Sequence, residues 1–162
     1  MKRIQDNLTL IAVNDDNGEI MGIRIISTSK KEDQSHPLTF HDENVHKLFK
    51  LLNHVSDKGD VFNRLRVTRA FDFIALAVRR KYRKRGLGTE LMAAAVELVK
   101  NLEPDSACIT GLGTSRYSQT IFERLGFENM YEVMYRDYSV DGKTVIRSNG
   151  EHEKIVCYAM KI

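Results

Sequence analysis

A basic run that ends in a glycine turn is the stretch of this sequence with the clearest chemical meaning. Residues 79–89 read RRKYRKRGLGT, with six basic side chains in the first seven positions. Gly86 and Gly88 lack a Cβ atom, so the backbone can turn sharply and bring several N–H groups close to a ligand. If a helix follows the turn, its positive N-terminus adds to the same site. These features together suit a diphosphate.

Several kinds of segment share this composition. A Walker loop requires GxxxxGK followed by Ser or Thr, and a Rossmann loop requires GxGxxG directly after a strand. The first string is absent, and in the second Leu91 takes the third glycine position. A nucleic-acid surface normally adds aromatic platforms to its basic residues, whereas only Tyr82 interrupts this run. A solvated loop remains an alternative, since charge runs are usually exposed.

Hydrophobic spacing predicts the elements that would position this turn. Residues 8–13 and 20–26 are β-rich runs around the turn composition NDDNG, which predicts a hairpin. Residues 39–55 have apolar positions at helical spacing, and a shorter helix is predicted around residues 60–65. Residues 71–78 are nearly continuously apolar, which is typical of a buried strand.

The second half of the chain continues the alternation of helices and strands. An apolar stripe predicts a helix over residues 91–102, before Pro104, so the glycine turn falls between a strand and a helix. The elements predicted after it are a strand at 107–110, a helix that ends at Gly126, and two antiparallel strands at 129–138 and 154–162 around Asp141-Gly142. This order predicts one α+β (mixed α/β) domain over residues 1–162.

The composition narrows the class of protein. Of the 162 residues, 42% are hydrophobic and 29% are charged, and the net charge is only +3, so the basic run is a local feature. Cys108 and Cys157 lie in apolar runs without metal-ligand spacing, which predicts buried reduced thiols and no metal site. No apolar stretch reaches the length of a signal peptide core or a membrane span. We therefore expect a cytoplasmic protein with no membrane or nucleic-acid partner.

The glycine turn also carries a family resemblance. Arg83 to Gly88 read R-x-x-G-x-G, which resembles the acetyl-CoA signature of the GNAT superfamily of N-acetyltransferases. The resemblance implies the GNAT fold, a central mixed and mostly antiparallel sheet flanked by helices, and acetyl-CoA (coenzyme A) as cosubstrate without a metal. In that family, loop amides hold the pyrophosphate and an N–H of the preceding strand faces the acetyl oxygen. The implied contact residues are Val78, Arg83, Lys84, Arg85, Gly86, Leu87, Gly88 and Thr89.

A second stretch narrows the resemblance to one subfamily. Residues 114–127, TSRYSQTIFERLGF, are similar to insect-type arylalkylamine N-acetyltransferases, which show a YS pair ahead of an EKLGF-like ending. Asp60-Val-Phe62, Asp137-Tyr138 and His152 also fit that subfamily. The implied reaction is attack of a primary amine on the acetyl thioester. The implied partners are acetyl-CoA and a small amine such as dopamine, serotonin or tyramine.

The resemblance also suggests which side chains take part in the reaction. Many GNAT enzymes place a tyrosine acid four residues before the glycine of the final G-F, but that position is Phe122 here, which cannot donate a proton. A serine on the same helix is proposed for the insect-type subfamily, and it corresponds to Ser118, for catalysis or coenzyme contact. Thr114, one turn earlier, is a second hydroxyl position.

Both catalytic candidates have a structural alternative. From local sequence alone, Ser118 is equally well explained as the N-cap of a helix. His152 matches a family position and is a candidate for the amine pocket or a proton route. A lone histidine at the start of a strand is more often a surface or structural residue.

The resemblance covers the chain from the first hairpin onward. A full GNAT domain opens with a strand and two helices before that hairpin, and we expect this chain to lack them. The subfamily glutamate assigned as general base lies in that region, so no residue here is expected to take its role. Two functions follow as expectations: an arylalkylamine N-acetyltransferase, or a coenzyme A-binding GNAT domain with little or no activity that acts as a binding module.

Overall fold

A six-stranded sheet forms the centre of the computed structural model, which describes residues 8–33, 41–102, 107–140, 142–146 and 150–162. The strands are β1 (Leu10–Val13), β2 (Ile20–Lys30), β3 (Arg69–Val78), β4 (Ala107–Gly113), β5 (Glu128–Met134) and β8 (Lys154–Lys161), in the order β1-β2-β3-β4-β8-β5. Only β3 and β4 are parallel neighbours, and every other pair in this sheet is antiparallel. The expected mixed, mostly antiparallel sheet is confirmed.

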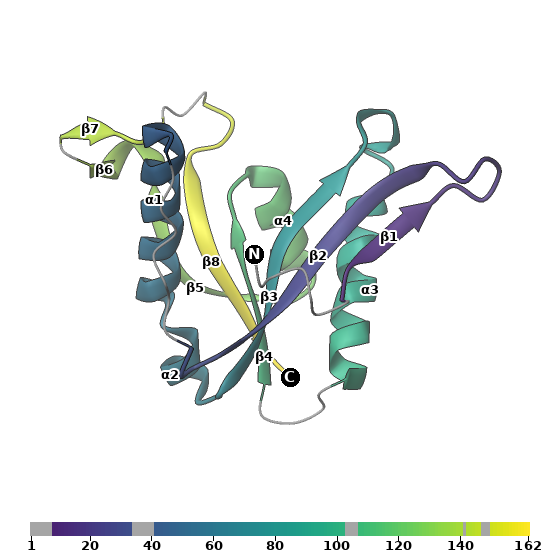
Figure 1. Ribbon diagram of the computed structural model, residues 1–162, viewed down its shortest axis with the longest axis horizontal. Coiled ribbons are helices and arrows are strands. Elements are labelled where there is room, and N and C mark those ends of the chain that lie inside the picture. Colours follow the sequence, from purple (N-terminus) through teal and green to yellow (C-terminus); the bar gives the residue numbers. More distant parts are fainter. Residues whose placement is uncertain (1–7, 34–40, 103–106, 141, 147–149) are drawn as a thin grey trace.

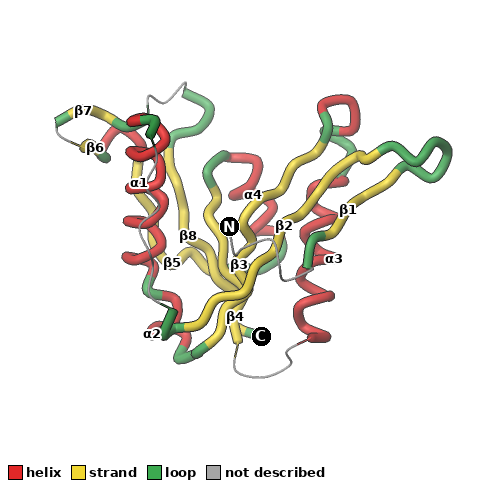
Figure 2. The backbone as a smooth tube through the Cα atoms, in the orientation of Figure 1, coloured by secondary structure: helices red, strands yellow, loops and turns green. Residues whose placement is uncertain are grey.

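Helices cover both faces of this sheet (Figure 1). The helical elements are α1 (Glu43–Gly59), α2 (Val61–Leu65), η2 (Arg80–Tyr82), α3 (Leu87–Leu102), α4 (Arg116–Arg124) and η3 (Tyr135–Asp137). The tube in Figure 2 shows α1 on the side of β8 and β5, and α3 beside β1 and β2. The segment before Asp42, where the first helix was predicted to begin, includes residues outside the described part. Asp42 caps α1 by accepting hydrogen bonds from the N–H groups of Asn44 and Val45.

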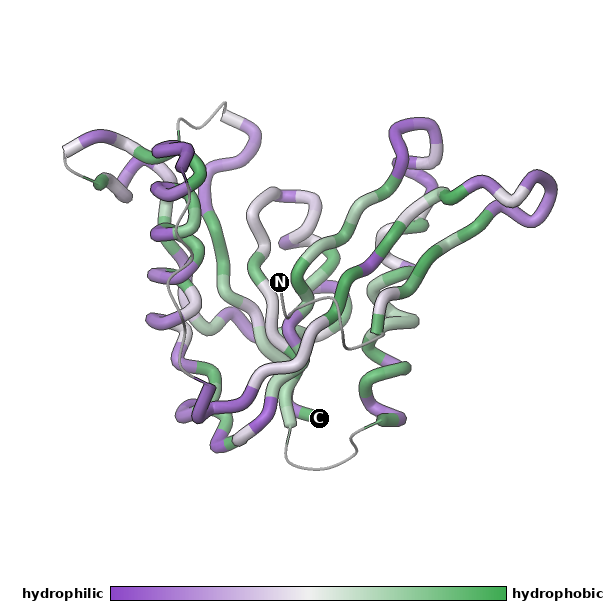
Figure 3. The backbone as a smooth tube through the Cα atoms, in the orientation of Figure 1, coloured by the Kyte–Doolittle hydropathy of each residue, from purple (hydrophilic) through white to green (hydrophobic). Residues whose placement is uncertain are grey.

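The apolar residues form two layers, one on each face of the sheet. β8 supplies both, because Val156 and Tyr158 face the α3 and α4 side while Cys157 and Ile155 face α1. Figure 3 shows the hydrophobic positions along the strands and the polar ones at the loops. Cys108 and Cys157 are buried free thiols, as predicted. Burial raises the pKa of Cys108 to about 12 and that of Cys157 to about 11, so both are protonated at neutral pH.

The region between the last two predicted strands differs from the prediction. β5 and β8 do pair antiparallel, but β5 ends at Met134 rather than at residue 138. The chain leaves the sheet through η3, where the Tyr135 N–H donates to the Glu153 carbonyl at 2.8 Å. A separate small hairpin of β6 (Ser139–Val140) and β7 (Lys143–Thr144) follows. Gly142 therefore belongs to this hairpin and not to a turn between the long strands, while Asp141 lies outside the described residues.

No helix among the described ranges is both long enough and apolar enough to cross a membrane.

The close approach of α1 to β8 predicts that a residue larger than glycine at position 59 destabilises the protein. A Cβ atom added to Gly59 would lie 2.6 Å from Sγ of Cys157. Gly59→Ala should therefore lower the free energy of unfolding by about 1–2 kcal/mol, as expected when a packed site is overfilled. Urea unfolding followed by circular dichroism measures this loss.

A double variant supplies the control for this prediction. In Gly59→Ala with Cys157→Ala the sulfur atom is gone, so the loss should be smaller than the sum of the two single losses by at least about 0.5 kcal/mol. Strictly additive losses would show that these two positions do not constrain each other.

Candidate functional site

The two parallel strands at the centre of the sheet separate at one end. The pairing of β3 with β4 ends at Phe73 opposite Gly111, although β3 continues to Val78. Figure 1 shows this last part of β3 leaning away from β4. A Cβ atom on Gly111 would lie 2.7 Å from Cζ of Phe122, so that ring is packed directly against β4. Beyond Phe73, the edge of β3 that would face β4 has no strand neighbour among the described residues.

A β-bulge lies next to the point of separation. Ile25 of β2 is opposite Ala75 and Ile26 is opposite Phe73, so Ile74 is an extra residue in β3. Bulges bend a strand and redirect its backbone and side chains. The bulge comes directly after the last residue that pairs with β4, which is where the strand changes direction.

The hydrogen-bond alternation of the ladder shows which backbone groups face the separation. The Arg79 N–H donates to the Met21 carbonyl at 2.9 Å, which makes Val78 opposite Gly22 a pair without mutual hydrogen bonds. Such pairs alternate along an antiparallel ladder, so Leu76 is also in that class. The N–H groups of Leu76 and Val78 therefore point away from β2, toward the open edge of β3.

A cavity of about 240 Å³ lies along this edge. One wall is the backbone and side chains of β3 from Ile74 to Leu76, and another is the hydroxyl-rich start of α4. The hydroxyl residues that line it are Thr114, Ser115 and Ser118. Among the described residues, no three His, Cys, Asp or Glu side chains gather as they would around a metal ion. The cavity thus brings the open edge of β3 at Leu76 together with side-chain hydroxyls.

Ser118 lines this cavity and also stabilises the start of α4. The N-cap is Ser115, whose Oγ accepts from the Ser118 N–H at 3.2 Å, so Ser118 is not the cap itself. In return, Ser118 Oγ accepts from the Ser115 N–H at 3.1 Å, which completes a capping box. The Ser118 hydroxyl can also donate to the Ser115 carbonyl at 2.9 Å. Thr114 precedes the cap and therefore lies before the helix, not one turn earlier on it.

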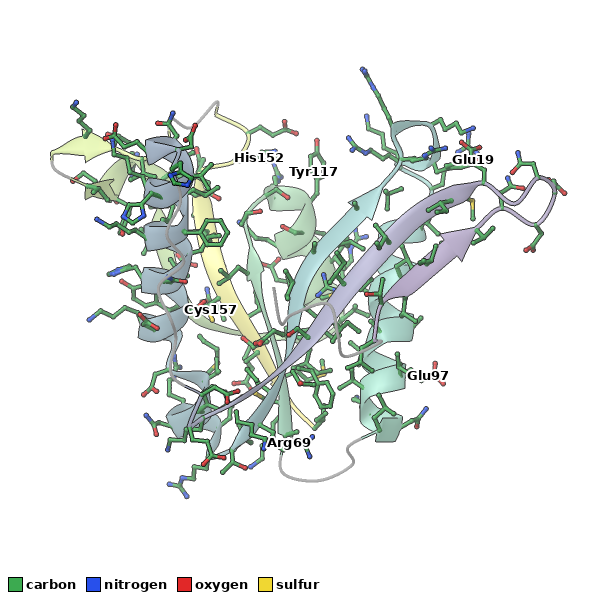
Figure 4. All side chains as sticks on the ribbon, viewed as in Figure 1. Glu19, Arg69, Glu97, Tyr117, His152 and Cys157 are labelled. Atoms are coloured by element: carbon green, nitrogen blue, oxygen red, sulfur yellow. The ribbon has the colours of Figure 1, made fainter. Side chains whose placement is uncertain are left out.

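His152 lies at the side of α4 and does not line the cavity. Its ring is 5.6 Å from that of Tyr117, in an edge-on arrangement visible near the top of Figure 4. Its Nδ1 is 3.5 Å from the Arg116 N–H, at the long limit for a hydrogen bond. The Tyr117 hydroxyl binds Glu151, and this bond raises the pKa of Tyr117. The structure thus brings Ser118 and Thr114 together but places His152 outside their cavity.

The glycine turn leads directly into the N-terminus of α3. Lys84 and Gly86 adopt left-handed backbone angles, with φ of 61° and 88°. The Gly86 carbonyl accepts from the N–H groups of Thr89 and Glu90 at 2.8 and 3.1 Å. Leu87 is the first helical residue, so its N–H and that of the next residue have no helix carbonyl within reach. These donors, together with the helix dipole, form a site for an anion.

The basic side chains around the turn divide into two groups. Arg79 and Lys81 form salt bridges with Glu19, which also accepts from the Tyr82 hydroxyl at 2.8 Å. The bond from Lys81 is the main reason that the pKa of Glu19 is lowered. Figure 4 shows Glu19 at the end of the β1–β2 hairpin, beside the loop. Glu19 thus ties the loop to the hairpin and neutralises part of its charge.

Among the other basic residues of the loop, one positions the backbone and three are available to a ligand. Arg83 donates from Nε to the Val78 carbonyl at 2.8 Å, which fixes the loop to the end of β3. Arg80, Lys84 and Arg85 are exposed, and their side chains have no hydrogen-bond or ion-pair partner in the described part of the chain. These three side chains can therefore meet phosphate groups.

Sequence reasoning missed three features of this site. The bulge at Ile74 and the contact of Glu19 with the loop depend on strand pairing, and no local pattern indicates them. Arg24 lines the cavity and is 3% exposed. Its only signal in the sequence was a charge inside the apolar run IMGIRII.

A protein-family model matches more than half of the chain. The match covers residues 50–141 and describes an acetyltransferase (GNAT) domain. These residues include β3, the glycine turn, α3, β4 and α4, and so contain most of the features described above.

Solved structures share the fold over nearly the whole chain. Arylalkylamine N-acetyltransferase 2 of Aedes aegypti is 25% identical with a TM-score of 0.88, over 99% of this chain and 76% of its own. The mosquito arylalkylamine N-acetyltransferase like 5b is 23% identical with a TM-score of 0.84, over 96% of this chain and 74% of its own. The Drosophila melanogaster polyamine N-acetyltransferase is 22% identical with a TM-score of 0.74, over 96% of this chain and 75% of its own. With the family match and the separated strands, these findings show that the chain belongs to the GNAT family of acetyltransferase domains.

Proposed function

We propose that this protein transfers the acetyl group of acetyl-CoA to a small primary amine in the cavity beside β3. One observation supports this above the others. The start of α3 lies against the open edge of β3, because a Cβ atom on Gly88 would lie 3.8 Å from side-chain atoms of both Leu76 and Val78. A coenzyme with a pyrophosphate at one end and amide-containing arms suits a path along these two elements.

The residues along this path fit the donor by their chemistry. The N–H groups of Leu87 and Gly88 would hold the pyrophosphate, and Lys84 and Arg85 would add charge-assisted bonds. The Val78 and Leu76 N–H groups would bond the arm and the acetyl oxygen. Acetyl-CoA supplies an activated acetyl thioester. In the same proposal Arg83 and Thr89 shape the loop, Arg83 by its bond to the Val78 carbonyl and Thr89 by its bond to the Gly86 carbonyl.

The reaction requires that protons move in step with the bonds. The amine nitrogen forms a bond to the acetyl carbon, the carbon–sulfur bond breaks, and the sulfur ends as a thiol after the amine has lost a proton. Ser118 is proposed to give a proton to the sulfur or to position it. Its hydroxyl would first have to rotate away from the Ser115 carbonyl. Thr114 offers a second hydroxyl in the cavity, and His152 is proposed as a more distant proton route.

The acceptor is proposed to be an arylalkylamine such as dopamine, serotonin or tyramine. The support is the similarity to solved arylalkylamine N-acetyltransferases. Solved structures named as agmatine and polyamine N-acetyltransferases share the same fold, so aliphatic amines belong in any test. Calorimetric titration with acetyl-CoA, followed by a thiol-release assay on tryptamine, dopamine, tyramine and agmatine, tests both halves of the proposal. Absence of acetyl-CoA binding would refute it.

The unpaired cations of the loop predict a large effect of charge reversal. Arg85→Glu should weaken acetyl-CoA binding about 10-fold or more, because a hydrogen bond to a charged group contributes about 1.5–3 kcal/mol and every 1.4 kcal/mol is tenfold. Titration calorimetry at two salt concentrations measures the affinity. The loss should be smaller at high salt.

A variant far from the loop is the matched control for this charge change. Lys50→Glu alters the net charge equally, at an exposed position of α1 on the other face of the sheet. It should leave the affinity within about twofold of wild type. Equal losses in the two variants would show that overall charge, and not the loop, attracts the coenzyme.

The capping box makes the test of Ser118 a comparison of two variants. Ser118→Ala should lower kcat by about 10- to 100-fold and leave acetyl-CoA affinity nearly unchanged. Ser115→Ala removes the N-cap and should destabilise the protein by about 1 kcal/mol, with the smaller effect on kcat. Thermal unfolding and steady-state kinetics on both proteins give the comparison. If the loss of turnover follows the loss of stability in both variants, the role of Ser118 is structural.

A further inference from the structure

A buried cation on β2 lacks the partners that such a group normally has. Arg24 is 3% exposed, and its Nε and Nη2 atoms make no hydrogen bond to any described residue. Its neighbours on the same face of β2 are Gly22, which lies against Leu91 of α3, and Ile26, which belongs to the core under that helix. Arg24 therefore occupies a position where an apolar side chain would be expected.

Arg24 belongs to the wall of the cavity beside β3, although its Nε and Nη2 atoms are covered in the free protein. Arg24 lines it together with Leu76 and Ser118, and its Cζ lies 4.1 Å from the centre of the Phe73 ring. Packing on the ring face orients the planar group and contributes a cation–π attraction. No Asp or Glu side chain is among the described residues that line the cavity. In the described part of the cavity wall, the face of the Phe73 ring is therefore the group that attracts this charge.

Such an arrangement is costly unless a further group completes it. Burial lowers the pKa of Arg24 to about 9, with no acidic neighbour to oppose the shift, so the side chain is still charged at neutral pH. A buried donor without an acceptor loses its hydration without replacement, and a buried charge loses more. An oxygen acceptor that enters the cavity would complete the arrangement.

A small movement of the Arg24 side chain would present the two unpaired atoms to the cavity, and these atoms define the shape of that acceptor. In a guanidinium group, the Nε–H and one N–H of Nη2 lie side by side on the same edge, so together they can grip one oxygen atom that carries negative charge. The cavity holds the open edge of β3 at Leu76 and the hydroxyl of Ser118. In the proposed reaction, one oxygen atom in this cavity gains negative charge when the amine attacks, namely the carbonyl oxygen of the acetyl thioester.

We propose that Arg24 donates hydrogen bonds from Nε and Nη2 to the thioester carbonyl oxygen and stabilises the negative charge that develops on it. This inference rests on the proposed acetyl transfer. It explains why a buried cation is kept without a partner in the protein: the fixed charge acts only when the bond to the amine forms, and no solvent must reorganise at that moment. The N–H group of Leu76, which lines the same cavity, acts on the same oxygen.

The key test is a variant in which stability and catalysis should move in opposite directions. Arg24→Met keeps an unbranched side chain as far as the Nε position and removes the guanidinium charge. We expect kcat to fall about 100-fold and acetyl-CoA affinity about 10-fold, with the affinity for free CoA unchanged. The melting temperature should stay the same or rise, because an unpaired buried charge has been removed. Arg24→Lys keeps the charge without the paired donors and should have an intermediate kcat.

A second variant on the same strand controls for changes to buried polar groups in general. Ser27 is 2% exposed and its hydroxyl contacts the Thr28 carbonyl at 3.4 Å, away from the cavity. Ser27→Ala should change neither kcat nor the two affinities. Steady-state kinetics, calorimetry with CoA and acetyl-CoA, and thermal unfolding are measured on all four proteins.

Each other outcome overturns the inference in a recognisable way. A kcat of Arg24→Met within threefold of the wild-type value would show that Arg24 takes no part in the reaction. Equal loss of affinity for CoA and acetyl-CoA would assign the contact to an amide carbonyl of the pantetheine arm. A melting temperature that falls together with kcat would make the role structural. If the wild-type protein binds no acetyl-CoA, the proposed function itself fails. The variants alone cannot produce this result, so the two failures can be told apart.

Discussion

The site depends on a single break in the strand pairing of the sheet. A parallel strand in the interior normally pairs on both edges, because buried backbone N–H and C=O groups need partners. β3 gives up this pairing after Phe73, and the bulge at Ile74 turns its remaining residues away from β4. The donors left on its edge are therefore preorganised for an external acceptor. Phe122 lines the resulting cavity and stacks on Tyr158 with ring centroids 4.8 Å apart, so it belongs to the core as well as to the site.

The position of the basic loop follows from contacts on both sides of it. Arg83 bonds the last carbonyl of β3, and Glu19 of the hairpin binds two other basic residues of the loop. These bonds hold the start of α3 in line with the open edge of β3. The remaining cations are exposed, where charge attracts a polyphosphate without the cost of burial. Arg24 presents the contrasting case, a buried charge with no acidic side chain among the described residues around its cavity.

Much of this architecture could be predicted from local patterns, and the exceptions share one physical cause. The hairpin, the buried strand, the helix before Pro104 and the glycine turn each have their own signal in spacing or composition. The R-x-x-G-x-G string could be assigned because its chemistry lies in consecutive residues. The bulge and the Glu19 contacts depend on tertiary pairing. Arg24 was missed because its burial depends on residues from β3, α3 and α4.

Amide hydrogen exchange by NMR, with and without acetyl-CoA, tests the open edge of β3 most directly. The N–H groups of Ala75 and Ala77 face β2 and should be protected in both states. Those of Leu76 and Val78 should exchange faster in the free protein and become protected when acetyl-CoA saturates it. Unchanged exchange at Leu76 and Val78 in the saturated protein would contradict the account, because the coenzyme would then bind without completing the edge of β3.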